Sequence, residues 1–421
     1  MSFSLILFNT LLVLFIPVII LVMGIPRLFR YIKRNRGTFL RRFRVPPGEI
    51  FPGGVLFQAS SIGEVKIALP VARRLRAKGF PVYIFTVTPE GRLMAAGSGA
   101  FNGSFLAPFD AFFVAGKFLK KFAPGCVILI ELQLWPNLID QASRVSKVVI
   151  LNGRISDRSF PRYRLVRPFI KKLLGLISVI SARTEKDRRR FISLGAAPEK
   201  VKLTGNIKYD TLLTTPAAFK AKEAFGVPHR LPVITAGSTH GGEEEMIVNA
   251  VLRIMKDREL LCVIAPRHIE RIPALEKLLR KNNLKYSLFS RSGGVKNGDR
   301  FLLIDRFGAL PQMYHISDIC FVGGSLVPHG GQNFVEAVGL RRPVCVGPHN
   351  ANFHQEFDIF KDVLFVAEDE DSLFKIFSAL LEKPSVGKEK AGKAYERLKL
   401  LTGALDRNVG IIEKIMEGDI S

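Results

Sequence analysis

The sequence predicts an α/β protein with two open, doubly wound domains in succession. Short apolar runs alternate with amphipathic segments along most of the chain, and this alternation falls into two series. A parallel strand covered by helices on both faces reads as a continuous apolar run, and such runs alternating with helices build an open parallel sheet. A third observation, an uncharged apolar stretch over residues 1–26, predicts a membrane anchor before the first domain.

The composition is that of a folded chain with an anionic partner. Of 421 residues, 48% are hydrophobic and 24% are charged, which excludes a disordered or low-complexity protein. Lys and Arg number 62 against 37 Asp and Glu, so the net charge is +25. That charge favours nucleic acid, phospholipid or a phosphorylated substrate as partner. The 4 cysteines are widely spaced in apolar runs, which predicts buried, reduced thiols and a reducing compartment.

The N-terminal stretch has the length of a membrane-spanning helix. Its apolar part, Leu5–Met23, is long enough for a hydrocarbon core of about 30 Å. No Lys or Arg precedes Arg27, whereas a cleaved signal peptide usually begins with basic residues. A basic juxtamembrane segment, 27–47, follows. It predicts a single-pass protein whose body stays in the cytoplasm, against anionic headgroups.

The first domain is predicted over residues 48–210. Its expected helices are Glu64–Lys78, Ala111–Phe122, Tyr163–Leu174 and Glu185–Leu194. Its expected buried strands are Val55–Phe57, Pro81–Thr86, Cys126–Ile130, Val148–Leu151, Ile177–Ser181 and Val201–Leu203.

The second domain is predicted over residues 231–385, after a linker at 211–230 and before closing helices within 386–421. Its expected helices are Glu243–Met255, Ile272–Lys281, Leu310–His315, Asn333–Val338 and Ser372–Glu382, and the closing helices are Lys388–Leu400 and Val409–Met416. Its expected strands are Val233–Ala236, Leu261–Ala265, Tyr286–Phe289, Phe301–Ile304, Ile319–Val322, Val344–Val346 and Leu364–Val366.

Ligands of doubly wound domains bind where strands end and helices begin, so polar residues in these loops are the candidates for a site. In the first domain, Gln58–Glu64 is a small-residue loop, and Glu131–Asn137 places a carboxylate beside the only Trp. A buried carboxylate is costly without a partner. The alternative for the first loop is that Ser61 and Glu64 only cap the helix. The alternative for the second loop is that Trp135 is a core residue.

Two further segments of the first domain carry basic residues. Asn152–Arg164 alternates basic and aromatic residues and suits acidic headgroups or a phosphorylated lipid, unless it is an ordinary solvated helix. Thr204–Asp210 lies at the predicted domain boundary, where Lys208 could counter a leaving phosphate or could simply be a solvated surface residue.

In the second domain, three loops could bind a phosphate. Ala236–Glu245 joins a glycine loop to a helix start, and Arg267 can bind phosphate with two nitrogens. Gly323–Glu336 holds four glycines before a helix, which predicts a cradle of N–H groups for an anion. Glu336 could accept hydrogen bonds from ribose hydroxyls. A purely structural glycine turn is the alternative.

Several chemistries lack their motifs. The sequence has no GxxxxGK[ST] phosphate loop, no HExxH metal helix and no GxSxG nucleophile elbow. Asp369-Glu370-Asp371 has the spelling of a metal-binding DxD motif, but its place before a helix indicates a capping run.

Six motifs in this order resemble the 3-deoxy-D-manno-octulosonic acid (Kdo) transferases of lipid A biosynthesis. The resemblance runs from the apolar N-terminal segment to Gly347-Pro348-His349. It rests on Ser60-Ser61-Ile62-Gly63-Glu64, Glu131–Asn137, Thr204–Asp210, Ala236-Gly237-Ser238-Thr239, Pro266-Arg267-His268, and Gly324-Ser325-Leu326-Val327-Pro328 through Asn333 and Glu336.

The resemblance implies a GT-B glycosyltransferase with two Rossmann-like domains facing a cleft. It would move Kdo from CMP-Kdo to a lipid A precursor at the inner membrane, by inversion and without metal or other cofactor, and would bind no nucleic acid. Glu64 would be the base, and Glu131 and Lys208 would stabilise the transition state. The donor site would comprise Pro266, Arg267, Gly308, Ala309, Leu310, Asn333, Phe334, Val335, Glu336, Ser238 and Gly324, and the acceptor site Ser61, Gly63, Arg154 and Arg158.

The chain departs from the family pattern at three places. Gln58-Ala59-Ser60-Ser61 stands where the family usually has His-Ala-Val-Ser, Gly308-Ala309-Leu310 where it has Gly-Glu-Leu, and Gly330-Gly331-Gln332-Asn333 where it has Gly-Gly-His-Asn. Two alternatives remain on sequence alone. One is a UDP-sugar transferase or UDP-sugar 2-epimerase of the same fold, and the other is a membrane-tethered protein that binds nucleic acid or phospholipid.

Overall fold

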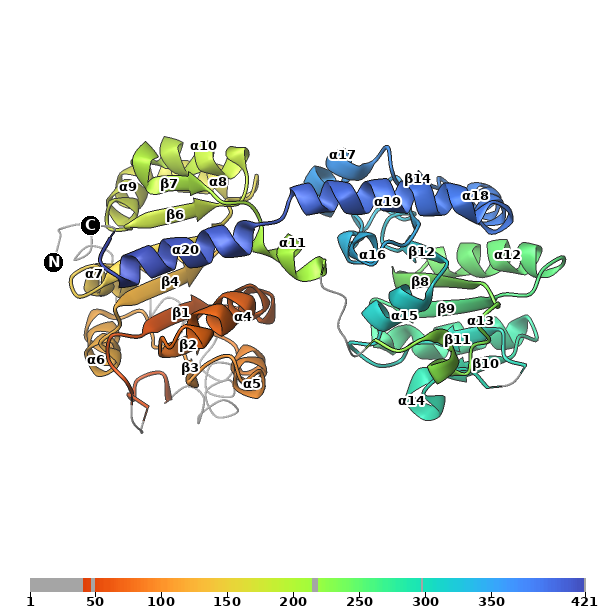
Figure 1. Ribbon diagram of the computed structural model, residues 1–421, viewed down its shortest axis with the longest axis horizontal. Coiled ribbons are helices and arrows are strands. Elements are labelled where there is room, and N and C mark those ends of the chain that lie inside the picture. Colours follow the sequence, from red (N-terminus) through yellow and green to blue (C-terminus); the bar gives the residue numbers. More distant parts are fainter. Residues whose placement is uncertain (1–40, 47–49, 214–218, 297, 420–421) are drawn as a thin grey trace, which may run out of the picture. The chain divides into compact units, whose positions relative to one another are not determined.

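The computed structural model describes residues 41–46, 50–213, 219–296 and 298–419 (Figure 1). Its contacts divide the chain into two compact units, residues 1–210 with 402–421 and residues 211–401. Each unit contains one seven-stranded sheet, and every strand pair that is aligned in either sheet is parallel. The predicted pair of doubly wound α/β sheets is therefore confirmed.

The sheet of the first unit has the order β3-β2-β1-β4-β5-β6-β7. Its strands are β1 (Val55–Ala59), β2 (Val82–Thr86), β3 (Gly103–Leu106), β4 (Cys126–Ile130), β5 (Lys147–Gly153), β6 (Val179–Ala182) and β7 (Val201–Leu203). Its helices are α4 (Ile62–Ala77), α5 (Pro89–Gly97), α6 (Phe112–Phe122), α7 (Pro136–Ala142), α8 (Phe160–Leu165), α9 (Arg167–Gly175), α10 (Glu185–Leu194), α11 (Ile207–Leu212, whose last turn crosses the unit boundary) and α20 (Ala404–Met416), with a 3-10 turn at Pro198–Lys200.

The sheet of the second unit has the order β10-β11-β9-β8-β12-β13-β14. Its strands are β8 (Val233–Thr239), β9 (Leu261–Pro266), β10 (Tyr286–Leu288), β11 (Phe301–Leu303), β12 (Ile319–Val322), β13 (Val344–Val346) and β14 (Phe365–Val366). Its helices are α12 (Glu243–Met255), α13 (Ile272–Lys281), α14 (Phe289–Ser292), α15 (Leu310–Ile316), α16 (Val335–Gly339), α17 (His354–Phe360), α18 (Glu370–Glu382) and α19 (Pro384–Leu400), with 3-10 turns at Lys222–Phe225, Ile269–Arg271 and Ala351–Phe353.

Burial on both faces explains why the central strands are continuous apolar runs. Strands β1, β2 and β4 have five residues each, and every one of these residues is buried. Side chains alternate between the faces, so Val55 and Phe57 pack in one apolar cluster, while Leu56 packs in the other. Helices α4 and α6 cover these two faces with Val65 and Phe118, respectively.

In the first unit, the structure corrects three local predictions. Strand β3 was missed because its Gly103-Ser104-Phe105-Leu106 lies at the sheet edge, is mostly half-buried and lacks an apolar run. The single helix predicted over Tyr163–Leu174 is two helices that meet at Val166, because Pro168 has no N–H to donate to Arg164 O and its ring clashes with that carbonyl group. Helices α5 and α7, which both begin with Pro in the first turn, were also missed.

The end of the chain returns to the first unit. Helix α20 packs on α4 and adds Ala404, Val409 and Ile412 to the apolar cluster there (Figure 1). The backbone N–H of Gly403 donates to Asp210 Oδ1 at 2.7 Å, which fixes the point of return. Helix α19 stays in the second unit. Phe225, within the segment predicted as a linker, joins the core of the second unit.

The four cysteines are buried free thiols, as predicted. Burial raises the pKa of Cys126, Cys262 and Cys320 to about 12, so these thiols stay protonated. The Asp369 run is also confirmed as a cap, because its carboxylate accepts from Ser372 N at 2.8 Å in a reciprocal capping box.

The predicted anchor, 1–26, and most of the basic segment, 27–47, lie outside the described residues. No helix within the described part of the chain has the length and apolar character needed to span a bilayer. The last residues of the basic segment that are described pack onto the first unit. Phe43 stacks on Phe109 with 4.7 Å between ring centroids, and Arg42 Nη1 donates to Ala107 O at 3.3 Å.

Candidate functional site

The first unit places two predicted site loops on either side of its topological switch point. Strand order reverses between β1 and β4, which are neighbours in the sheet although β2 and β3 lie between them in sequence. The loops that follow parallel strands diverge at such a point and leave a crevice at the carboxyl ends. Glu64 follows β1, and Glu131 follows β4.

Glu64 lies in the first turn of α4, half-buried, with its carboxylate held by two donors. Ser60 N donates to Oε2 at 2.6 Å, and Gln133 Nε2 lies 3.2 Å from each carboxylate oxygen. Burial raises the pKa of Glu64 above its usual value, and the nearby charge of Glu131 raises it further. The two donors and Lys208 act in the opposite direction. A carboxyl group with a raised pKa is a stronger proton acceptor when ionised.

Gln133 is the residue of this site that the sequence analysis did not single out. Its Oε1 accepts from Ser60 Oγ at 2.5 Å and from Trp135 Nε1 at 3.2 Å. Because the carbonyl oxygen has two donors, the amide nitrogen must face Glu64. Trp135, for which a core role was the alternative interpretation, thus orients the group that holds the carboxylate. The available signal was the position of Gln133, two residues after Glu131.

Glu131 adopts a backbone conformation that is unfavourable for a side-chain-bearing residue. Its φ is +59°, in the left-handed region, and its N–H donates to Leu151 O at 2.9 Å. Such strain persists only where the surroundings enforce it, and it clusters at functional sites. The Glu131 carboxylate has the partner that the sequence analysis required, because Lys208 Nζ lies 3.4 Å from Oε1.

A hydrogen bond with the end of β5 positions the start of α11, the helix that carries Lys208. Asn152 also has a positive φ, +57°, and its Oδ1 accepts from Ile207 N at 3.0 Å at the start of α11. Asn206 Oδ1 accepts from Lys208 N at 3.2 Å. The Lys208 side chain remains about half exposed. The structure therefore brings Glu64, Glu131 and Lys208 into one electrostatically coupled group.

Among the predicted acceptor residues, Ser61 and Gly63 flank this group, and both are exposed. Ser61 also caps α4, because its Oγ accepts from Glu64 N at 3.4 Å, so the capping interpretation holds together with the functional one. Arg154 and Arg158 are exposed on the connection from β5 to α8.

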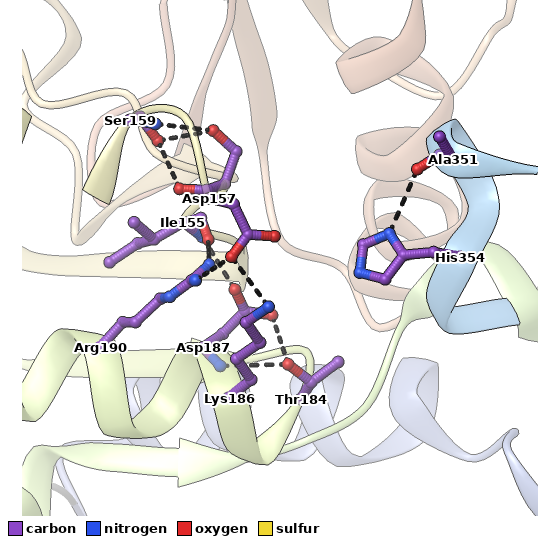
Figure 2. Close-up of polar contacts among 10 residues, drawn as sticks. Ile155, Asp157, Ser159, Thr184, Lys186, Asp187, Arg190, Ala351 and His354 are labelled. Carbon is purple, nitrogen blue, oxygen red and sulfur yellow. Dashed lines mark hydrogen bonds and ion pairs between the residues drawn. The ribbon is translucent and has the colours of Figure 1, made fainter. Parts of the chain in front are cut away.

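That connection is fastened to the start of α10, as Figure 2 shows. Asp157 pairs with Arg190 and, at 2.8 Å, with Lys186. Hydrogen bonds from Lys186 and Arg190 lower the pKa of Asp157 to about 2. Asp187 Oδ1 accepts from Ile155 N at 2.9 Å. A hollow of about 440 Å³ adjoins this network and is lined by Phe160, Glu185, Lys186, Arg189, Arg190 and Ser193.

The second unit corrects the predicted phosphate cradle. The fully buried carboxylate of Glu243, at the start of α12, accepts from Gly324 N at 2.7 Å and from Ser325 N and Leu326 N at 2.9 Å each. It also accepts from His240 N at 2.9 Å. The glycine loop does bind an anion, but this anion is the chain's own side chain. The N–H of Gly324 is therefore already engaged.

The remaining predicted donor residues lie near the carboxyl ends of β8, β9 and β11. Pro266 ends β9, and the exposed Arg267 follows it. Ser238 has a φ of +55° at an irregularity near the end of β8. Gly308, with a φ of +87°, and Ala309 precede α15, and Leu310 begins that helix.

Leu310 and Tyr314 pack so closely on β8 that a side chain at Gly237 would clash. A Cβ there would lie 2.7 Å from Leu310 Cδ1 and 2.1 Å from Tyr314 Oη. This contact explains why a glycine occupies that strand position.

The residues Asn333 to Glu336 split into two kinds. Asn333 Nδ2 donates to Glu336 Oε1 at 3.0 Å, and both side chains are half-buried. Phe334 and Val335 are core residues, exposed by 0% and 1%, so only their backbone could contact a ligand. Helix α16 begins at Val335 rather than at the predicted Asn333.

Within the described residues, no group of three or more His, Cys, Asp or Glu side chains is arranged to hold a metal ion. The described groups at the strand ends are a half-buried carboxylate, a charged pair, and basic and amide side chains.

These two sheets define the class to which the protein belongs. A solved glycosyltransferase from Rickettsia africae matches 87% of the chain and 99% of its own length, with a TM-score of 0.58 and 15% identity. The UDP-GlcNAc 2-epimerase from Neisseria meningitidis matches 84% of the chain and 100% of its own, with a TM-score of 0.58 and 16% identity. At such identities the likeness concerns the fold alone, an α/β fold of the GT-B type.

The sequence relatives are more specific. The family model described as 3-deoxy-D-manno-octulosonic-acid transferase (kdotransferase) matches residues 29–211. The 3-deoxy-D-manno-octulosonic acid transferase of Haemophilus influenzae is 33% identical over 432 aligned positions, which cover 98% of this chain and 99% of the relative. That of Chlamydophila psittaci is 27% identical over 86% of both chains. The chain belongs to the Kdo transferase family and is a glycosyltransferase.

Proposed function

We propose that the protein transfers Kdo from CMP-Kdo to a lipid A precursor and releases CMP. The observation that carries this proposal is the carboxylate of Glu64, which Gln133 and Ser60 orient beside the Glu131–Lys208 pair. The relatives that share this chain's length are Kdo transferases by name, which supports Kdo as the transferred sugar.

The proposed step is an inverting displacement at the anomeric carbon of Kdo. The acceptor hydroxyl oxygen forms the new bond to that carbon, and Glu64 takes the hydroxyl proton as the bond forms. The bond from the anomeric carbon to the phosphate oxygen breaks, and its electron pair leaves with CMP. An alcohol is a poor nucleophile until a base removes its proton, and a base with a raised pKa is suited to that task.

Charge stabilisation is the proposed role of Glu131 and Lys208. Glu131 faces the positive charge that develops on the sugar, and the cation of Lys208 balances the negative charge that develops on the leaving phosphate. Arg267 supports the phosphate in the second unit, because the amides of the glycine loop are occupied by Glu243. Asn333 and Glu336 are proposed to bind the nucleoside. No metal takes part in the proposed transfer.

The acceptor explains the charge and the N-terminal segment of the chain. A lipid A precursor is a phosphorylated glycolipid held in a bilayer, so the enzyme must work at an anionic surface. The chain's net charge of +25 and its apolar segment at 1–26 suit a single-pass inner-membrane protein that acts on the cytoplasmic side. Arg154 and Arg158 are the proposed contacts to the acceptor.

The test is a transfer assay on the full chain in detergent, with CMP-Kdo and a tetra-acylated lipid A precursor. Mass spectrometry of the lipid should show an increase by whole Kdo units. Glu64→Gln should abolish it, whereas Glu90→Gln should retain it, because Glu90 is an exposed carboxylate in the first turn of α5. Activity should survive a chelator, in agreement with a metal-free transfer.

Two results would contradict the proposal. If the protein is folded but the lipid is unchanged and CMP-Kdo stays intact, the donor would be another nucleotide sugar. The UDP-sugars used by transferases and epimerases of this fold would then be candidates. Transfer by Glu64→Gln at the wild-type rate would retain the reaction and reject Glu64 as its base.

A further inference from the structure

Three imidazole rings meet at the carboxyl ends of neighbouring strands in the second unit. His240 directly follows β8, His268 lies two residues after β9, and His329 lies in the loop after β12. The rings of His240 and His329 stack with 4.4 Å between centroids, and those of His240 and His268 meet edge to face at 5.8 Å. The sequence analysis assigned none of these three side chains to the site.

The position of this histidine cluster is that of a ligand site. The strand order of the second unit reverses between β8 and β12, which pair directly. His240 and His329 thus follow the two strands at the switch point, where ligands of doubly wound sheets bind. His268 and His329 are exposed, and His240 is half-buried, so a solute can reach all three rings.

The surroundings of the histidine cluster favour an anion. Burial has the largest effect and lowers the pKa of His240; the positive charges of His329, His268 and Arg267 lower it further, and the charge of Glu243 acts in the opposite direction. The nearest carboxylate, Glu243, is saturated by four backbone N–H groups. Across the part of the chain that is described, no carboxylate forms an ion pair with any of the three rings. Gln332 Nε2, 3.3 Å from His240 Nε2, adds an amide.

We propose that His240, His268 and His329 form a carboxylate subsite, and that it binds the acid group of the donor sugar. This inference rests on the proposed function, because that function makes the donor a sugar acid linked to a phosphate. The donor then carries two anions. Arg267 suits the phosphate through its fixed pair of nitrogens, and the imidazoles remain for the carboxylate. The subsite would let the enzyme distinguish an intact donor from the released nucleotide.

The test compares two ligands that differ by the sugar acid. Isothermal titration of the full chain with CMP and with CMP-Kdo, in the absence of acceptor, gives both dissociation constants. His268→Asn and His329→Asn alter exposed rings and leave the core intact. Each should weaken CMP-Kdo by about tenfold, the loss expected for one charge-assisted hydrogen bond, and should leave CMP within about twofold.

The control is His229→Asn, an exposed imidazole of the same unit that pairs with Glu223 at 3.2 Å. It should leave both dissociation constants unchanged. Unchanged CMP binding by the variants also shows that they are folded.

Each other result has a definite meaning. Equal weakening of CMP and CMP-Kdo would make the histidine cluster a phosphate site and overturn the carboxylate assignment alone. No weakening of either ligand by the variants would reject the subsite, while a wild type that still transfers Kdo would leave the proposed function standing. A wild type that binds neither ligand would overturn both.

Discussion

The amide nitrogen of Gln133 lies 3.2 Å from both carboxylate oxygens of Glu64. It is held there because Ser60 Oγ and Trp135 Nε1 both donate to the Gln133 carbonyl oxygen. Gln133 thus lies two positions after Glu131 in the sequence and orients the carboxylate of Glu64. Gln133 is therefore a positioning residue, and it stabilises the ionised form of Glu64.

Replacing Gln133 by Met should lower kcat by roughly tenfold to a hundredfold. This is the effect expected when the hydrogen bond from Gln133 to the charged Glu64 carboxylate is lost. The loss of a donor to the ionised carboxylate should also raise the pKa of Glu64 further, so the acidic limb of the kcat/KM profile should move to higher pH. Gln141→Met, in α7, is the matched control. An unchanged pH profile with a lowered kcat would contradict this role of Gln133.

Glu131 offers a test of stored backbone strain. At a φ of +59°, glycine is free of the penalty that a side chain carries, which is about 1 kcal/mol or more. Glu131→Gly should therefore unfold at higher urea than Glu131→Ala, with both inactive in Kdo transfer. Trp135 fluorescence reports on this region, because it is the only Trp of the chain. An alanine variant more stable than the glycine variant would show that the conformation is not strained.

The Glu131–Lys208 pair should matter for rate and little for stability. Lys208→Met and Glu131→Gln should each lower kcat by about a hundredfold, and the double variant by less than the product, because the two charges act together. Since Lys208 is half exposed, loss of the pair should change the free energy of unfolding by only about 0–1 kcal/mol. Arg144→Met removes another partly exposed pair and should leave kcat unchanged. Strictly multiplicative losses would mean that the charges act independently.

Glu243 should be a structural carboxylate. Glu243→Gln would turn an amide NH₂ toward backbone donors and should destabilise the protein by about 3 kcal/mol. Glu245→Gln, an exposed neighbour in the same helical turn, should cost less than about 0.5 kcal/mol. Thermal unfolding followed by far-UV circular dichroism measures both. If Glu243→Gln keeps full stability and loses only donor binding, the glycine loop belongs to the ligand after all.

Asp110 should make the first unit less stable as pH rises. Burial raises its pKa from 3.8 to about 6, although Leu138 N and Asn137 N donate to it. Between these two values the folded state binds the proton more tightly than the unfolded state. The contribution of Asp110 to stability is therefore fully present below pH 3.8 and is lost as pH rises through about 6. In Asp110→Asn this fall should disappear, whereas in Asp140→Asn it should persist. Urea midpoints from Trp135 fluorescence at several pH values measure it.

The sheets could be predicted where burial is complete. The bounds of Cys126–Ile130, Ile319–Val322 and Val344–Val346 agree with the structure to the residue, because every position in them faces a helix layer and must be apolar. The edge strand Gly103–Leu106 escaped detection, since its half-buried residues carry no such requirement.

The candidate site could be predicted only as a set of loops. Resemblance named Glu64, Glu131 and Lys208, and the structure joins them. The same reasoning named Phe334 and Val335, whose side chains are in the core. The glycine pattern predicted an anion cradle over Gly323–Glu336, where the amides of Gly324, Ser325 and Leu326 donate to Glu243 instead. A motif identifies which residues recur together, and it does not identify which atoms are already bonded within the fold.

The sequence by itself determined the two α/β series, the strands of the core and the loops that carry charge, because hydrophobic burial imposes a local period on each element. Only the tertiary structure decided which polar atoms meet. Gln133 reaches Glu64 across 69 positions, and Glu243 reaches the glycine loop across 81 to 83. Such pairings depend on the order of strands in the sheet, which brings loops that are distant in sequence to one edge.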